Sequence, residues 1–168
     1  IKELTAAKVL EARGVAHLSV DIIKKCLSRS ERYKFTEFAY ESAKMLKYYY
    51  GMKIRNNRDY CHYRDLAKSY KELLMIEDLA TEYFVEVDFY YENDRINLAN
   101  GYNFCKVRYE ELAPYLDKYD SHRLHLPTRI IEVQMHSLNR DIPAMLSACQ
   151  TSIAYFKEKD IPIGIQMF

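Results

Sequence analysis

Glycine, proline and tryptophan are scarce in this chain of 168 residues, which has four glycines, four prolines and no tryptophan. Because β-sandwiches and barrels need many turns, this shortage argues against both architectures. The glycines stand at positions 14, 51, 101 and 164. They are too far apart for a phosphate-binding loop or a dinucleotide fingerprint. The composition therefore predicts one helix-rich domain over residues 1–168, and the absence of an initial Met fits a fragment of a longer chain.

Cysteine clusters and long apolar runs are also missing. The four cysteines, Cys26, Cys61, Cys105 and Cys149, stand far apart without a CxxC pair, so we expect neither a zinc site nor a disulfide framework, and no cofactor. Lone reduced thiols are typical of intracellular proteins, and we expect a cytoplasmic location. The longest uncharged stretch, residues 142–156, contains serine, glutamine and threonine and is too short to span a bilayer. We expect no membrane partner.

Charge is divided unevenly along the chain, although the total is only +1. Residues 1–75 hold 16 Lys and Arg against 9 Asp and Glu, a net charge of +7, whereas residues 76–168 carry a net charge of −6. Such an asymmetry can steer a partner or a second copy of the protein. The basic half also contains the run Tyr48, Tyr49 and Tyr50, but acidic residues are interleaved with its cations and no nucleic-acid-binding signature occurs, so nucleic acid is not the expected partner.

Apolar residues recur at three- and four-residue spacing through nearly the whole chain, as at Val20, Ile23 and Leu27, which predicts an all-α fold. We expect about eight helices, with the paired segments 109–120 and 127–138 counted as one. The others are roughly 3–12, 15–28, 31–50, 59–73, 76–91, 95–106 and 142–158. Gly51 is expected to end the third helix, Asn57 or Asp59 to cap the fourth, and Asp141 to cap the last.

Three prolines bear on these boundaries. Pro127 is expected in the first turn of its helix, where the missing N–H costs nothing, as is Pro143 after the cap at Asp141. Pro114 falls inside the segment 109–120, where it should either kink the helix or mark its true start.

A period of about 33 residues relates several of these segments, with small residues and tyrosines at recurring positions. The clearest unit has Tyr63, Leu66, Ala67 and Tyr70, followed by Leu79, Ala80, Tyr83 and Val87. This unit resembles the tetratricopeptide repeat family, and the resemblance extends in degenerate form over residues 16–158. It implies a right-handed stack of antiparallel helical hairpins. The recurring tyrosines, which include Tyr33, Tyr40, Tyr70, Tyr83, Tyr109 and Tyr115, are interpreted as its packing layer.

The resemblance also implies a function. Helical repeats of this family bind proteins or peptides in a concave groove, often as the sensory or scaffolding part of a bacterial regulator in signal transduction or transcription regulation. We therefore expect a non-enzymatic binding module whose ligand is a protein or peptide, for which an acidic or C-terminal peptide is a candidate. The expected groove residues are Arg64, Lys68, Lys71, Asn97, Arg129 and His136. A solvated helix face is the competing interpretation of the three cations that lie on one helix.

Two other functions remain open. Arg55 and His62 enclose a short polar segment at a helix start, which resembles the signature of the HEPN superfamily of all-helical ribonucleases and nucleotide-binding domains. There the Arg would stabilise phosphate charge and the His would act as acid or base. Alternatively, the domain serves only to form oligomers, because an uncapped repeat end exposes apolar surface to a second copy. The histidines as a group show no metal-binding pattern.

Overall fold

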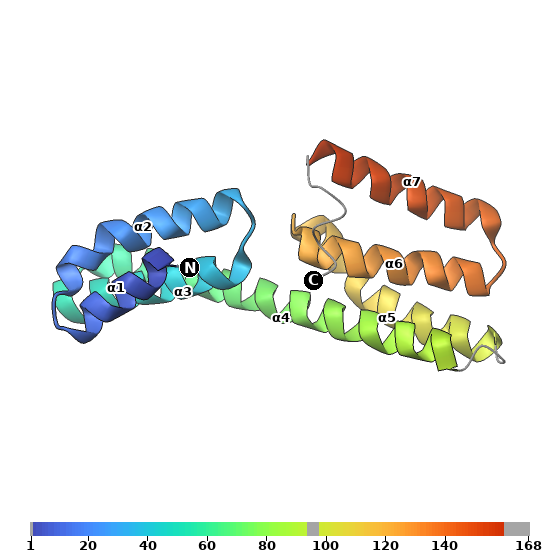
Figure 1. The fold of residues 1–168 in the computed structure, drawn as a ribbon, viewed down its shortest axis with the longest axis horizontal. Helices are drawn as coiled ribbons and strands as arrows, with labels where there is room; N and C mark the ends of the chain where they lie inside the picture. Colours follow the sequence, from blue (N-terminus) through green and yellow to red (C-terminus); the bar gives the residue numbers. More distant parts are fainter. Residues whose placement is uncertain (1, 94–97, 160–168) are drawn as a thin grey trace. The chain divides into compact units, whose positions relative to one another are not determined.

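The computed structural model describes residues 2–93 and 98–159, and within these ranges the only regular elements are helices. The all-α prediction is therefore confirmed. Seven α-helices and one π-helix follow in order: α1 (Lys2–Ala12), α2 (Ala16–Arg32), α3 (Thr36–Tyr48), the π-helix η1 (Tyr49–Ile54), α4 (Asn57–Asn93), α5 (Leu98–Lys118), α6 (His122–Leu138) and α7 (Ile142–Glu158). Figure 1 shows this succession along the chain.

The chain divides into two compact units, Ile1–Met75 and Ile76–Phe168, and each is described here by itself. This boundary coincides with the change of charge in the sequence, so the first unit carries a net charge of +7 and the second a net charge of −6. The expectation of one repeat domain over the whole chain, cut from a longer protein, stays a prediction.

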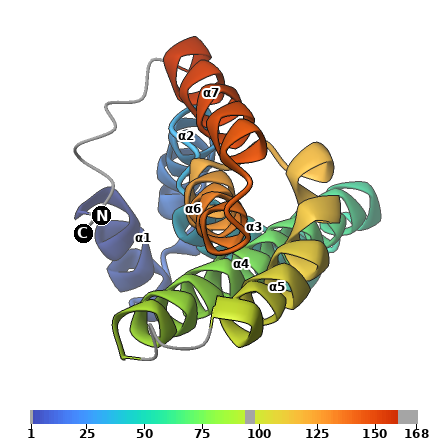
Figure 2. The same ribbon diagram turned by 90° about the vertical axis from the view of Figure 1, so that its right-hand side faces the viewer.

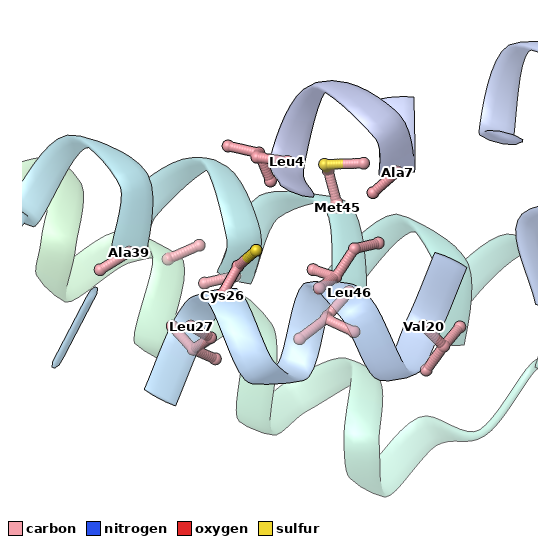
Figure 3. Packing of buried hydrophobic residues seen from close by; sticks show 11 residues of the cluster. Leu4, Ala7, Val20, Cys26, Leu27, Ala39, Met45 and Leu46 are labelled. Atoms are coloured by element: carbon pink, nitrogen blue, oxygen red, sulfur yellow. The ribbon is translucent and has the colours of Figure 1, made fainter. Parts of the chain in front are cut away.

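In the first unit, α1 packs on α2 and α2 packs on α3, while the first half of α4 completes the core. Figure 3 shows this core from close by, with Leu4 and Ala7 of α1 facing the side chains of α2 and α3. Ile23, Ala43 and Leu46 are fully buried in it. Small residues such as Ala7 and Ala43 permit close helix approach, as the sequence pattern suggests.

In the second unit, α5 packs on α6 and α6 packs on α7, an arrangement visible in Figure 2. The three-residue connections between these helices make each neighbouring pair antiparallel. The second half of α4 contributes Ile76, Ala80 and Val87 to a core that also contains Leu112 of α5 and Ile131 of α6. Hairpins of this kind are what the sequence predicts, while membership of a repeat family stays a prediction.

Two expected breaks between helices are absent from the structure. The segments 59–73 and 76–91 form one continuous helix, α4, because Leu73, Leu74 and Met75 are good helix formers with no breaker among them. The segments 95–106 and 109–120 likewise merge into α5, with Pro114 inside it. Leu112 and Leu116 are both buried around this proline, so packing on both sides offsets the backbone hydrogen bond that proline removes.

The expected position of Pro127 in the first turn of its helix is wrong. Helix α6 begins at His122, so Pro127 lies in its second turn instead of at its start. The residue before the helix, Ser121, makes no side-chain cap, and its hydroxyl donates instead to Glu77 Oε1 at 2.5 Å. The cap at the last helix is confirmed, because Asp141 Oδ1 accepts from the backbone N–H of Ala144 at 3.1 Å and Pro143 stands in the first turn.

The recurring tyrosines have a more specific role than apolar packing. Several of them donate their hydroxyl to a carboxylate on a neighbouring helix: Tyr70 to Glu31 at 2.8 Å, Tyr83 to Glu111 at 2.6 Å and Tyr109 to Glu132 at 2.8 Å. Each tyrosine thus ties two helices together through its polar end. Tyr33 is the exception, because it is 56% exposed and its assignment to the packing layer is wrong.

Candidate functional site

The most distinctive local structure of the first unit is the segment that joins α3 to α4. It is a π-helix, an element that is rare and frequently found at functional sites. Gly51 was expected to end the preceding helix, but it lies within η1, and the turn is made instead by Arg55 in the left-handed region at φ 56°. The backbone N–H of Asn56 donates to the carbonyl of Tyr50 at 3.0 Å and closes the segment.

Packing around two tyrosines explains why the chain takes this path. A Cβ at Gly51 would lie 2.8 Å from Cδ2 of Tyr60, so only glycine lets the ring of Tyr60 lie against this backbone. The ring of Tyr50 is stacked on that of Tyr63 with centroids 5.4 Å apart, and Lys24 Nζ lies 5.6 Å from the Tyr50 ring centroid. The hydrogen bond to Tyr50 raises the pKa of Lys24. The segment is therefore held in place by aromatic contacts with the start of α4.

Helix α4 begins with a side-chain cap, although not at the expected residue. Asn56 Oδ1 accepts from the backbone N–H of Arg58 at 3.1 Å and from that of Asp59 at 3.3 Å, and Asn56 Nδ2 donates to Asp59 Oδ2 at 2.8 Å. The prediction that Asn57 or Asp59 caps this helix is therefore displaced by one residue, since Asn56 carries the capping oxygen.

An open pocket of about 540 Å³ lies beside this segment. The residues that line it come from the end of α3, from η1 and from the first turn of α4: Lys47, Tyr48, Tyr50, Gly51, Met52, Arg55, Asn56, Asn57 and Tyr60. Two of these are cations and none is a carboxylate. Its volume is in the range of small-molecule sites, and its lining combines positive charge with tyrosine rings.

The two cations of the pocket have no ion-pair partner among the described residues. Lys47 Nζ lies 4.5 Å from the centroid of the Tyr48 ring, a cation–π contact. Within residues 2–93 and 98–159, neither Lys47 nor Arg55 forms an ion pair. Arg55 is exposed, as is Met52, whose exposed fraction of 74% is high for an apolar side chain. The pocket thus presents both uncompensated positive charge and accessible apolar surface.

The predicted groove cations of α4 lie on the same helix face as this pocket. Asn57, Tyr60, Arg64, Lys68 and Lys71 are spaced three or four residues apart, which places them on one side of the helix. The opposite side of this half of α4, with Leu66, Ala67 and Tyr70 among its members, packs on the core of the first unit. The three cations are exposed. We call Arg64, Lys68 and Lys71 the basic stripe.

The members of the basic stripe differ in their availability. Arg64 Nε donates to Asp65 Oδ1 at 2.8 Å, and this contact lowers the pKa of Asp65. Lys68 and Lys71 have no ion-pair partner in the part of the chain that the structure describes. These two lysines are therefore the ones able to meet a carboxylate of a partner without first breaking an internal ion pair.

Of the other predicted groove residues, two lie in the second unit and one lies outside the described residues. Arg129 of α6 is half-buried and donates to Glu132 Oε2 at 2.7 Å, and the same carboxylate accepts from Tyr109. This arginine is thus engaged in an ion pair within α6, and the bond from Tyr109 to the same carboxylate joins α5 to α6. His136 is partly exposed farther along α6, and Asn97 lies outside the described residues.

Of the two residues of the ribonuclease alternative, one lines the pocket and the other does not. Arg55 lines it, whereas His62 does not. The His62 side chain is exposed, and its ring meets the edge of Tyr63 with centroids 4.9 Å apart. The pocket lining therefore does not contain the Arg and the His together.

Two other titratable side chains, those of His125 and Cys105, are buried in the second unit. The ring of His125 is stacked on Tyr155 with centroids 4.0 Å apart, and burial lowers its pKa. Burial raises the pKa of the Cys105 thiol to about 11, so the reactive thiolate is suppressed. Among residues 2–93 and 98–159, no cluster of three or more His, Cys, Asp or Glu side chains is placed to hold a metal ion.

Helix α7 exposes apolar residues on one side, with Ile142, Leu146 and Ile153 each about half exposed. These are the side chains that the oligomer alternative would use, and self-association stays a prediction. No helix in the described ranges combines the length and the apolar character needed to cross a membrane.

Comparison with known proteins yields no relative for this chain: no family model, no curated protein and no solved structure matches it.

Proposed function

We propose that this protein is a non-enzymatic binding module whose first unit holds an acidic segment of a partner protein along α4. The observation that carries the proposal is the basic stripe, in which Lys68 and Lys71 are exposed and form no ion pair with any residue that the structure describes. The net charge of +7 on the first unit supports it, because a field of that sign steers acidic partners toward this surface.

The chemistry of the stripe favours a peptide over an RNA backbone. Its cations occupy a helix face without aromatic residues between them, whereas single-stranded nucleic acids are held by cations interleaved with stacking rings. A row of lysines at helical spacing can instead meet the carboxylates of an acidic peptide through charge-assisted hydrogen bonds. A scaffolding or sensory role in a regulatory protein follows from this proposal, with the acidic partner as the signal.

A charge-reversal experiment tests the stripe. The double variant Lys68→Glu, Lys71→Glu changes the net charge by −4, and a matched control, Lys2→Glu with Lys25→Glu, makes the same change at exposed lysines on α1 and α2. An exposed ion pair contributes up to about 1 kcal/mol, so removing two and adding repulsion should weaken binding of a fluorescent Glu-rich peptide about tenfold or more. Fluorescence anisotropy at two salt concentrations measures this.

The control variant distinguishes binding at the basic stripe from attraction by the overall positive charge of the first unit. We expect it to lose no more than about threefold in affinity, because long-range charge effects are screened at physiological salt. Equal losses in the two variants would refute the stripe as a binding site. Tighter binding of an oligouridine than of the peptide would indicate a nucleic-acid partner, and RNA cleavage abolished by His62→Ala would replace the proposal with the ribonuclease alternative.

A further inference from the structure

The pocket beside η1 has properties that acidic-peptide binding along the stripe does not use. Its lining holds two cations, three tyrosines and an exposed methionine, and no carboxylate. A peptide carboxylate on the stripe would contact Lys68 and Lys71, neither of which lines the pocket. A ligand in the pocket would therefore be held by other side chains than those of the stripe.

Charge indicates the first property of that ligand. Lys47 and Arg55 both line the pocket and neither forms an ion pair within the described ranges. Lys53 and Arg58 stand nearby in the sequence, and the stretch 47–58 contains no acidic residue. Two uncompensated cations match a group with a charge of about −2, which a phosphate monoester carries near neutral pH and a single carboxylate does not. Arginine in particular can hold two phosphate oxygens at once.

The remaining lining indicates the second property. Tyr48, Tyr50, Tyr60 and Met52 are four of the nine lining residues, and surfaces of aromatic rings and thioethers favour a planar ring over a flexible polar chain. The Tyr50 ring is fixed by its stacking on Tyr63, and the Tyr60 ring by its contact with Gly51. At about 540 Å³ the pocket accommodates a small molecule.

We infer that the pocket formed by α3, η1 and the start of α4 is a binding site for a small aromatic phosphate monoester, with Lys47 and Arg55 holding the phosphate and the tyrosines contacting the ring. Mononucleotides and simple aryl phosphates share this chemistry. The pocket adjoins the face of α4 that carries the basic stripe, since Asn57 and Tyr60 belong to both.

Isothermal titration calorimetry with three probes tests the ligand class. Adenosine monophosphate and phenyl phosphate are titrated into the full chain, with adenosine as the uncharged counterpart. We expect one site for at least one of the phosphates and at least about tenfold weaker binding of adenosine, because charge-assisted hydrogen bonds supply much of the affinity. A preference for adenosine monophosphate over phenyl phosphate identifies a nucleotide, and the reverse a simple aryl phosphate. No binding of either phosphate, or equal binding of adenosine, overturns the inference.

Two variants locate the site. Arg55→Gly removes the cation and keeps a residue that accepts the positive φ of 56° without strain, and Lys47→Met keeps the helical stem without the charge. Each should weaken the phosphate probe about tenfold. The matched control is Lys53→Met, which removes a cation from the same π-helix outside the pocket lining. Equal loss in this control, or no loss in the first two, refutes the site.

The stripe variant keeps the two proposals separate. Lys68→Glu with Lys71→Glu should leave phosphate binding within about twofold, because neither lysine lines the pocket. Retained phosphate binding with lost peptide binding supports both sites. Loss of phosphate binding in this variant contradicts the separate pocket, whatever the peptide does.

Discussion

The hydrogen bonds between tyrosines and carboxylates allow a quantitative test of the fold. Tyr109 and Tyr83 both donate to a glutamate on the next helix, at 2.8 and 2.6 Å, but their surroundings differ. Tyr109 meets Glu132, whose side chain is only 13% exposed, whereas the bond from Tyr83 to Glu111 lies at the surface. Burial and the bond to Glu132 raise the pKa of Tyr109 to about 12. The shorter bond is thus the more solvated one.

We expect the burial of each hydrogen bond, and not its length, to determine how much it contributes to the free energy of unfolding. A hydrogen bond to a charged group contributes about 1.5–3 kcal/mol when it is shielded from water, and a half-buried bond belongs at the low end of that range. We expect Tyr109→Phe to lower the free energy of unfolding by about 1.5 kcal/mol and Tyr83→Phe by less than about 0.5 kcal/mol. In urea, a slope of about 2 kcal/mol/M converts the first value into a midpoint shift of about 0.7 M.

Urea unfolding followed by far-ultraviolet circular dichroism measures both variants, and a double-mutant cycle with Glu132→Gln isolates the Tyr109 bond. The cycle removes the separate effect of the Arg129 ion pair, because that ion pair changes equally with and without the tyrosine hydroxyl. A coupling energy near zero, or equal midpoint shifts for Tyr83→Phe and Tyr109→Phe, would refute the view that these bonds stabilise the helix pairs according to their burial.

Two further predictions concern the second unit. Replacing Asp141 by Ala should cost about 1 kcal/mol in urea unfolding, because the bond from the Ala144 N–H to the Asp141 carboxylate is lost, whereas Asp141→Asn should retain most of the stability. Stability should also fall at alkaline pH: the folded-state pKa of Tyr109, about 12, lies above its usual value of about 10, so its contribution is complete below pH 10 and is lost as the pH rises toward 12. Unfolding measured across that range should show a smaller decline for Tyr109→Phe than for the unsubstituted protein, and identical declines would contradict this assignment.

Helical periodicity predicts much of this fold because it depends on local spacing. The apolar positions Val20, Ile23 and Leu27 all lie in the core, and the cap at Asp141 follows from a short-range hydrogen bond that needs only a neighbouring helix start. Helix breaks are less predictable, since Pro114 remains within α5 through the burial of Leu112 and Leu116, a tertiary effect that its local sequence does not contain.

The candidate site is predictable only in part, for a related reason. The stripe on α4 follows from the three- and four-residue spacing of Arg64, Lys68 and Lys71, which any continuous helix would place on one face. The pocket instead depends on a π-helical turn whose end lies at Arg55, although Gly51 is the residue that favours a helix end in sequence.

Gly51 has a different use, and it explains why the sequence signal misleads. The absence of a side chain at Gly51 leaves room for the ring of Tyr60, which belongs to the following helix. The need for glycine at this position therefore depends on the tertiary contact with α4 and cannot be predicted from the local sequence. The backbone reversal then falls to Arg55, a residue for which positive φ is costly. At that position the chain brings a cation to the pocket, where a glycine in the same conformation would bring none. Because Arg55 and not Gly51 takes the left-handed conformation, the end of the π-helix places a cation in the pocket that Tyr48, Tyr50 and Tyr60 also line.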